Sequence, residues 1–448
     1  MSVYKNNVGA AKRLGAVLVV GLLACGPSAV NAQNQAAASV TPLSHFLEPL
    51  LKTDRRLAAA AEDMEASNQR AKAAAGDWFP TVKLTNWAGE ERIENPAGGG
   101  VTNMNARQTD LTLTQLVTDF GKTDSKVMRA RIAAQQGEVG YQLIKQTLIN
   151  DAASAYANLY RSGVQLRYAL ESEANLGKQF NLEQERFKAG GGVATDVLQV
   201  QAQLSGAQAR RFRAQVQVQN ASSRFFNLFG VAIRDMATLI SPAFPSSLPT
   251  SLEDALKQAP ESNLSIKNAM LSSESARESI RAERAESYYP KVEVIYDNKN
   301  KDNVLGTAGV KKEQLLKAQL TWSFNLGGAG INTVKAAEHA LTATEHRRTD
   351  TEKNAGEQVA IAWNTLMASR QTAAVYVDQV AALSKFLDLA RKERTLGSRS
   401  LLDVLNGETA LLNAQSDAIS SEIDVLLSGY AVLQSLGQLT DAAVLRVQ

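Results

Sequence analysis

The stretch FKAGGGVATDVL, residues 187–198, decides the fold once it is read beside the stretch TLGSRSLLDVL, residues 395–405. Both place glycine and then an Asp-Val-Leu triplet after a long segment of helical character, and Asp196 and Asp403 lie 207 residues apart. Glycine readily adopts the positive φ that ends a helix and reverses the chain. Alone, the three glycines also suit a phosphate loop or a flexible linker. Together, the two stretches predict the reversal points of two matched helical hairpins.

The segments on either side of these turns predict long helices. Residues 122–189 form a run of 68 residues without proline, in which apolar or small residues recur at steps of three and four. Residues 405–433 place leucine or isoleucine at every seventh position over five heptads. Both patterns are typical of coiled coils. At about 1.5 Å per residue, the first segment would form a helix about 100 Å long.

Four short segments alternate apolar and polar residues in the manner of β-strands. They are residues 79–91, 108–121, 289–297 and 317–328. Each fits a transmembrane β-strand, although an ordinary half-buried hairpin has the same pattern. Four strands cannot close a barrel, and an open sheet edge cannot lie in lipid. A membrane-spanning form therefore requires several copies of the chain, and closure alone does not choose between eight strands in a dimer and twelve in a trimer.

The order of these segments repeats along the chain. Pro80 and Pro290 each stop a predicted helix and begin a predicted strand, 210 residues apart. We expect a first structural repeat over residues 33–245 and a second over 246–448, each built as helix, two strands, long helix and helix. In the first repeat the two shorter helices, expected over residues 44–75 and 196–229, together match the long one in length, which predicts that they stack end to end alongside it.

The first 32 residues resemble an export signal. Their only charged residues are basic, and an apolar stretch, residues 14–24, precedes the small residues that end at Ala32. We expect residues 1–32 to be a signal peptide cleaved after Ala32. The alternative is a lipoprotein cleavage box at residues 22–25, which would leave Cys25, the one cysteine, as a lipidated N-terminus. The rest of the chain holds 45 basic and 45 acidic residues, so no basic surface for nucleic acid is expected.

Taken together, these features resemble the TolC family of outer-membrane export channels over nearly all of the mature chain. The resemblance rests on the helix–strand junctions DWFPTVKL and SYYPKVEV, the strand ends LTQLVTDFG and LTWSFNLGG, the two glycine turns, and residues 251–285. It implies a mainly α protein with a small β part. Long antiparallel coiled-coil helices would form a periplasmic tunnel. Four transmembrane β-strands per protomer would make a 12-stranded barrel in the outer-membrane lipid of a homotrimer.

The resemblance also implies a function and partners. The chain would be the passive, gated outer-membrane duct of a tripartite system for type I protein secretion or small-molecule efflux. It would work with a periplasmic adaptor protein and an inner-membrane transporter of the ABC or RND class. The alternative is a non-pore periplasmic coiled-coil adaptor or scaffold, although no strand-rich block of the kind that adaptors carry is evident.

By position, the resemblance assigns a periplasmic gate to the two turns. Arg399 would reach toward Thr195 and Asp196 of a neighbouring hairpin, and Asp403 would face the lumen in a ring of three carboxylates. The sequence departs from family members at two further positions: Arg394 stands where an aromatic gate residue can occur, and Asn406 where a second acidic ring can occur.

Two other assignments concern the ends of the hairpins. Gly190 and Gly397 would form the tips that contact the adaptor. The competing interpretation of Asp196 and Asp403 is that they only complement helix dipoles at the two N-termini. Ser400 and Asp403 fit a capping box in either case.

No catalytic chemistry is indicated. The glycine runs lack the Gly-Lys-Ser/Thr of a phosphate loop, and the three histidines include no pair at metal-binding spacing. We expect a protein that is not an enzyme and has no cofactor and no metal site.

Overall fold

The computed structural model describes residues 42–95, 100–233, 235–245, 247–323 and 325–445. The chain passes through the same succession of elements twice. The first pass consists of α1 (Leu43–Thr53), α2 (Arg55–Ala75), β1 (Thr81–Asn95), β2 (Gly100–Thr118), α3 (Lys122–Lys188) and α4 (Ala194–Phe229). The second consists of α5 (Leu252–Ser262), α6 (Leu264–Tyr288), β3 (Lys291–Asp302), β4 (Val310–Thr321), α7 (Ala329–Thr395) and α8 (Leu401–Leu436), followed by α9 (Asp441–Leu445). This confirms a mainly α protein with a small β part.

The two passes match in length. Helices α3 and α7 contain 67 residues each, and α4 and α8 contain 36 each. Their corresponding ends lie 207 residues apart, and each of these helices borders on a glycine of positive φ at the same relative positions. The prediction at the N-terminal side was less accurate. A single helix was expected over residues 44–75, but Asp54 divides it by capping α2, with its carboxylate accepting from the Arg56 and Leu57 amides.

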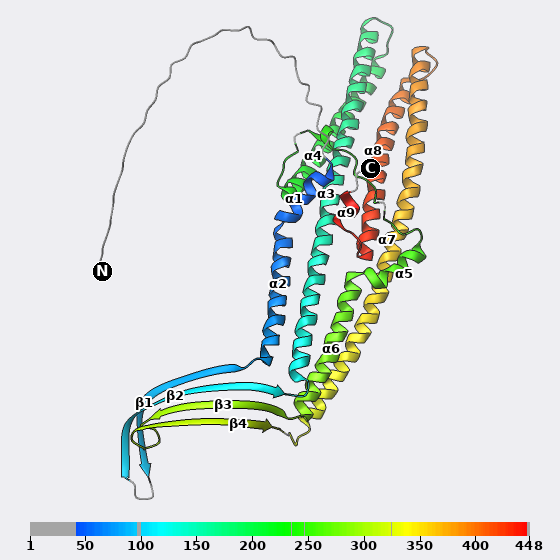
Figure 1. Cartoon of the computed structure of the whole chain (residues 1–448). Coiled ribbons are helices and arrows are strands. Elements are labelled where there is room, and N and C mark those ends of the chain that lie inside the picture. The colour runs from blue at the N-terminus through cyan, green and yellow to red at the C-terminus, as the bar shows by residue number, and fades with distance from the viewer. Residues whose placement is uncertain (1–41, 96–99, 234, 246, 324, 446–448) are drawn as a thin grey trace, which may run out of the picture. The chain divides into compact units, whose positions relative to one another are not determined.

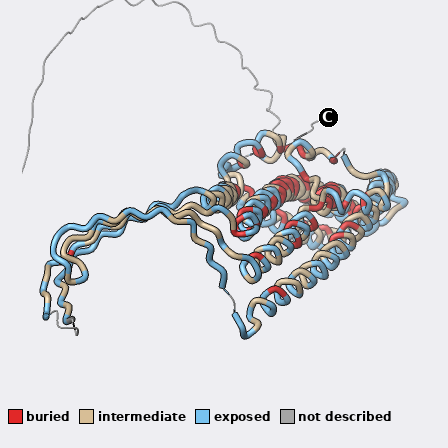
Figure 2. Tube along the Cα trace, turned by 60° about the horizontal axis from the view of Figure 1, so that its bottom comes forward, coloured by how far each residue is buried: buried red, intermediate tan, exposed pale blue. Residues whose placement is uncertain are grey.

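The shorter helices stack along the longer ones (Figure 1). Both α2 and α4 pack against α3, while α6 and α8 pack against α3 on one side and α7 on the other. The buried residues concentrate on the helices, whereas the strands are exposed or intermediate over most of their length (Figure 2). The end-to-end arrangement expected from helix lengths is therefore present within one chain.

The largest core cluster joins the middle of α3 to α1, the end of α4 and the end of α8. Its largest side chains are Phe46, Tyr156, Phe225 and Tyr430. The Tyr156 hydroxyl donates to the Ile240 carbonyl at 2.9 Å, and the Tyr430 hydroxyl donates to the Ala243 carbonyl at 2.9 Å. Burial raises the pKa of both tyrosines to about 12. These contacts fix the segment between the two passes against the helices.

The strands form one antiparallel sheet in the order β1-β2-β3-β4. Strands β1, β2 and β3 are longer than predicted, whereas β4 has the expected length of 12 residues but begins seven residues before the expected start at residue 317. The segment between the two expected strands, residues 298–316, is largely strand because its charges pair across the ladder. Lys301, for example, donates to Glu313 at 2.8 Å.

Candidate functional site

The first hairpin tip, between α3 and α4, is a tight glycine turn. Gly190 has φ +78°, its amide donates to the Phe187 carbonyl, and the Gly191 amide donates to the Arg186 carbonyl. This is the Schellman arrangement that ends helices. A Cβ at Gly192 would lie 2.7 Å from the backbone nitrogen of Phe187. Gly190 is therefore needed for its conformation and Gly192 for its close approach to the helix end.

The second tip, between α7 and α8, begins with the same hydrogen bonds. Gly397 has φ +79° and donates to the Arg394 carbonyl, and the Ser398 amide donates to the Glu393 carbonyl. The next helix is capped differently, since the Asp403 amide donates to the Ser400 hydroxyl at 3.2 Å. The N-cap of α4 is Val193, which offers no side-chain acceptor. The Ser400 cap agrees with the sequence pattern.

A charged cluster connects the two hairpins just behind their tips. Arg394 of α7 lies with Nη2 3.1 Å from Asp196 Oδ2 of α4 and 3.5 Å from Glu183 Oε1 of α3. Glu183 is only 2% exposed and is also paired with Arg186 at 3.0 Å. Arg394 therefore links α7 to both α3 and α4 through ion pairs. Sequence reasoning missed this pair, although opposite charges within two turns of each tip were a usable signal.

Arg399 contacts its own hairpin in the single chain. Its Nε donates to Glu393 Oε2 at 2.6 Å, its Nη1 lies 3.9 Å from Asp403 Oδ2, and its guanidinium carbon lies 5.3 Å from the Phe386 ring centre. The expected partners Thr195 and Asp196 are not among these contacts. The pairing of Arg399 with Thr195 and Asp196 was predicted for a neighbouring hairpin. Between two copies of the chain, this pairing stays a prediction.

The remaining gate and tip residues are accessible. The Asp403 side chain is 49% exposed, and Thr195, Asn406, Gly190 and Gly397 are also exposed. Exposed positions at a helix N-terminus allow either a luminal carboxylate ring or simple dipole compensation. Cys25 and the predicted signal peptide lie outside the described residues.

At its end nearest to the helices, the four-stranded sheet has one apolar face, which its pairing register creates. Val82 lies opposite Leu113, Leu113 opposite Tyr296, and Tyr296 opposite Leu316. The residues opposite one another share a face, so this row is apolar across all four strands. The adjacent row, on the other face, is mostly polar and consists of Lys83, Thr112, Asp297 and Leu315. Thr112 donates to Asp297 at 2.7 Å within it.

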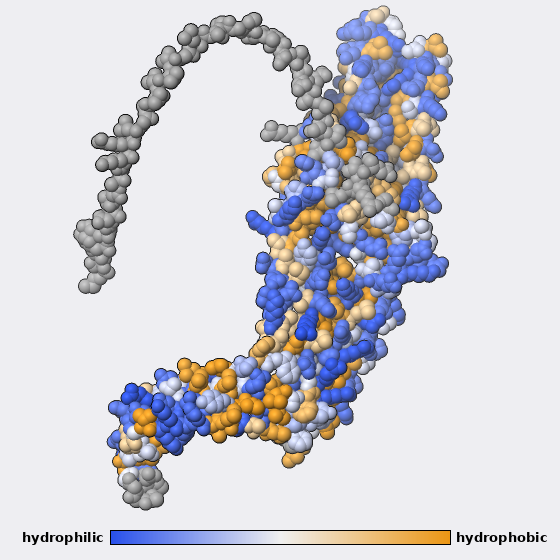
Figure 3. Space-filling view, viewed as in Figure 1, coloured by the Kyte–Doolittle hydropathy of each residue, from blue (hydrophilic) through white to orange (hydrophobic). Residues whose placement is uncertain are grey.

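Apolar residues gather on the part of the sheet nearest to the helices (Figure 3). Phe120 and Tyr289 stack with ring centres 5.4 Å apart, and both are about half exposed. Phe79 and Trp322 are also exposed beside the strand ends. An apolar band bordered by aromatic residues is typical of a lipid-facing sheet.

In the described part of the chain, no helix is both long enough and apolar enough to cross a membrane. Nor do three or more His, Cys, Asp or Glu residues there group so as to hold a metal ion.

Comparison with known families gives one extensive match. A family model described as outer membrane efflux protein matches residues 47–231 and 255–438. The chain is 26% identical over 355 residues to outer membrane protein TolC of Escherichia coli strain K12, covering 77% of this chain and 72% of the relative. It is 25% identical over 346 residues to the alkaline protease secretion protein AprF of Pseudomonas aeruginosa strain PAO1, covering 75% of this chain and 70% of the relative.

Solved structures agree with the fold. The outer-membrane channel OprN superposes with a TM-score of 0.77 at 20% identity, covering 88% of this chain and 90% of that chain. At this identity the likeness establishes the architecture.

Proposed function

The chain belongs to the outer membrane efflux protein family, and we propose that it forms the passive, gated outer-membrane duct of a tripartite export system. Its relatives are outer-membrane channel proteins and not enzymes. The chain is accordingly an outer-membrane protein, with the helical part in the periplasm, and acts in efflux or secretion as a channel.

The observation that carries the proposal is the four-stranded sheet, which has two edges and an apolar face at its end nearest to the helices. In the described residues, β1 and β4 each pair on one side only. An unpaired edge leaves amide and carbonyl groups without partners, which is costly in lipid. Closure by further copies satisfies them, and three copies supply twelve strands. We propose a homotrimer whose sheets close in the outer membrane around a water-filled path, with the polar face inward.

We propose that the tips form the periplasmic gate. Arg399 of one copy would pair with Thr195 and Asp196 of a neighbouring hairpin, and Asp403 would contribute one carboxylate to a ring at the entrance. The contacts of Arg399 with Glu393 and Asp403 support a charged, adjustable lock at this level. Gly190 and Gly397, exposed at the outermost turns, would be the seats for a periplasmic adaptor.

The class of cargo follows from the inner-membrane partner. One relative is named for secretion of an alkaline protease, and another, from Brucella suis, is named an efflux protein. Type I secretion with an ABC transporter and small-molecule efflux with an RND transporter are both compatible with a passive duct. Cargo would be driven by the transporter, while this chain supplies the path and the gate.

Single-channel recording tests this proposal. The purified protein in planar lipid bilayers should give discrete conductance steps, and the outer-membrane fraction should contain a trimer that dissociates on heating. A trimer that forms no pore would contradict the duct. A periplasmic, non-membrane species would instead support the scaffold alternative.

A further inference from the structure

Helix α4 carries a polar stripe where a coiled coil ordinarily places apolar residues. Its members follow one another at steps of three and four residues and are Arg210, Arg213, Gln217, Asn220 and Arg224. Such spacing keeps side chains on one face of a helix. The stripe runs over about 20 Å at about 1.5 Å per residue.

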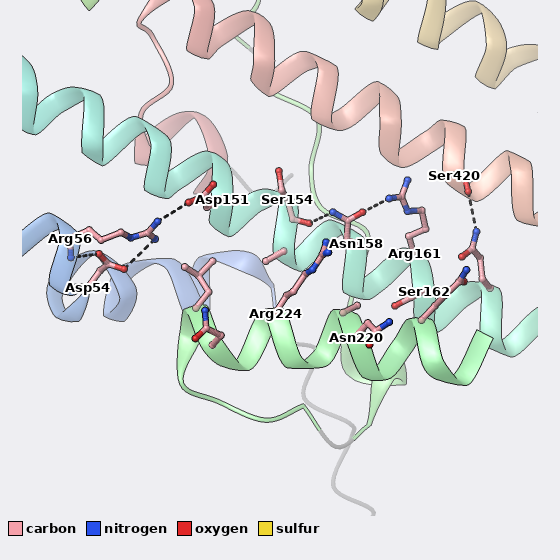
Figure 4. A pocket seen from close by; sticks show the side chains of 16 residues that line it. Asp54, Arg56, Asp151, Ser154, Asn158, Arg161, Ser162, Asn220, Arg224 and Ser420 are labelled. Carbon is pink, nitrogen blue, oxygen red and sulfur yellow. Dashed lines mark hydrogen bonds and ion pairs between the residues drawn. The ribbon is translucent and has the colours of Figure 1, made fainter. Parts of the chain in front are cut away.

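This stripe lines a continuous groove between α3, α4 and α8. Arg210 and Arg213 line a cavity of about 250 Å³, and Arg224 lines a larger cavity of about 990 Å³. Gln165 and Gln217 line both cavities and so connect them. Figure 4 shows the larger cavity, with Arg224 of α4 extending toward α3.

The other walls are mainly neutral hydrogen-bonding groups. Helix α3 contributes Asn158 and Gln165, and α8 contributes Asn413, Ser416 and Ser420. Gln165 donates to the Ser420 hydroxyl at 3.0 Å. Amides and hydroxyls of this kind donate hydrogen bonds readily without adding negative charge.

The cationic charge in the groove is only partly compensated. Arg56 is paired with Asp151 at 3.0 Å, and Arg161 with Asp424 at 3.1 Å. Within the described ranges, Arg210, Arg213 and Arg224 have no carboxylate partner. The groove therefore holds an excess of positive charge.

Arg210 is the most informative of the three. Its Nε and Nη2 atoms are buried and make no hydrogen bond in the described part of the chain. Burial, and then the charge of Arg213, lower the pKa of Arg210, yet a guanidinium stays protonated in proteins. A buried charged donor without a partner is costly. An anion in the small cavity would supply the missing acceptor.

We propose that the groove between α3, α4 and α8 is an oxyanion-binding site, with Arg210 and Arg213 as its principal ligands and Arg224 extending it. It takes sulfate, phosphate or carboxylate groups, which match the planar donor geometry of arginine. Asp424, which pairs with Arg161 of the larger cavity, lies three heptads beyond Asp403 on the same face of α8. If the proposed function places Asp403 in the lumen, the groove faces the transported molecule, and anionic groups on that molecule are its ligands.

Calorimetric titration of the full-length purified protein with sulfate, at constant ionic strength in chloride, tests the site directly. The unmodified protein should bind sulfate saturably. Arg210→Gln combined with Arg213→Gln should weaken binding at least about tenfold, because charge-assisted hydrogen bonds are removed. Arg211→Gln is the matched control on the same helix, since Glu173 already neutralises Arg211 at 2.6 Å.

Asn413→Asp gives a second variant that removes no groove-lining arginine. Adding a carboxylate to the wall should also weaken sulfate binding. Two results would overturn the site. One is that the unmodified protein binds no sulfate, as when a neighbouring copy already neutralises the arginines. The other is that the double variant binds sulfate as well as the unmodified protein does.

Recording in a KCl gradient separates this inference from the proposed function. The double variant should shift the reversal potential toward cation selectivity, whereas Arg211→Gln should not. Sulfate binding by a protein that forms no pore would refute the duct and leave the anion site standing. An unchanged reversal potential in an active channel would refute the luminal position of the groove.

Discussion

The two hairpin tips start from the same backbone hydrogen bonds and then diverge. Gly190 and Gly397 end their helices alike, 207 residues apart, but the third turn residue is Gly192 in one tip and Arg399 in the other. The first turn folds back onto its helix end so closely that a Cβ cannot be accommodated, whereas the second leaves room for a charged side chain that binds Glu393. One repeated turn thus provides a compact tip in the first hairpin and a charged tip, with the Arg399–Glu393 ion pair, in the second.

The largest effect is expected from Gly192→Ala. The added Cβ would meet the Phe187 backbone nitrogen at 2.7 Å, so the turn must open, at a cost of about 3 kcal/mol in the free energy of unfolding of the tip. Hydrogen exchange at the end of α3 should become faster. Arg399→Ala, at the equivalent position, should leave exchange at the end of α7 much less affected. Equal responses at the two tips would contradict the difference in backbone space.

Arg394→Ser should have the next largest effect. It takes one of two arginines away from the buried Glu183 and leaves Asp196 unpaired, which should cost about 2 kcal/mol in the free energy of unfolding. Chemical denaturation of the purified protein measures the change. Lys188→Ser is the control, because its exposed pair with Glu185 should contribute almost nothing. A loss no greater than that of the control would show that the cluster does not join the hairpins.

Exchanging the helix caps should have a smaller effect, of opposite sign at the two tips. Ser400→Ala removes the acceptor for the Asp403 amide and should destabilise the start of α8 by about 1 kcal/mol. Val193→Ser should stabilise the start of α4 by about 0.5 kcal/mol, because that helix has no side-chain cap. Hydrogen exchange at the two N-termini distinguishes the effects, and a stabilising Ser400→Ala would contradict the capping assignment.

Arg399→Ser should change stability least but alter the channel. The Arg399–Glu393 ion pair is partly exposed, so solvent screening limits its contribution to the free energy of unfolding to below about 1 kcal/mol. Losing that much stabilisation of a closed state raises the open fraction by up to about fivefold. Single-channel conductance should therefore rise, while Arg399→Lys should retain part of the lock. Unchanged conductance would remove Arg399 from the gate.

The sequence predicted those features that depend on local rules. Glycine conformation, the Ser400 cap and the coiled-coil spacing place both turns, helix α3 and the start of α8 almost to the residue. The start of α2 was missed because Asp54 interrupts a helical pattern only through its cap. The extent of β3 and β4 was missed because Lys301 and Glu313 look like loop residues until the register places them together. The pairing of Arg394 with Asp196 joins residues 198 positions apart and needed tertiary packing.

Because Arg394 of the second hairpin pairs with Asp196 of the first, the two hairpins must keep matching lengths. Inserting one heptad into both α3 and α4 would preserve every local pattern yet carry Asp196 about 10 Å past Arg394. Such a chain would lose its interhelical pair and present two tips at different depths. Lengthening or shortening this protein without that loss requires matched changes in all four helices, so the distance that it spans can change only when both repeats change together.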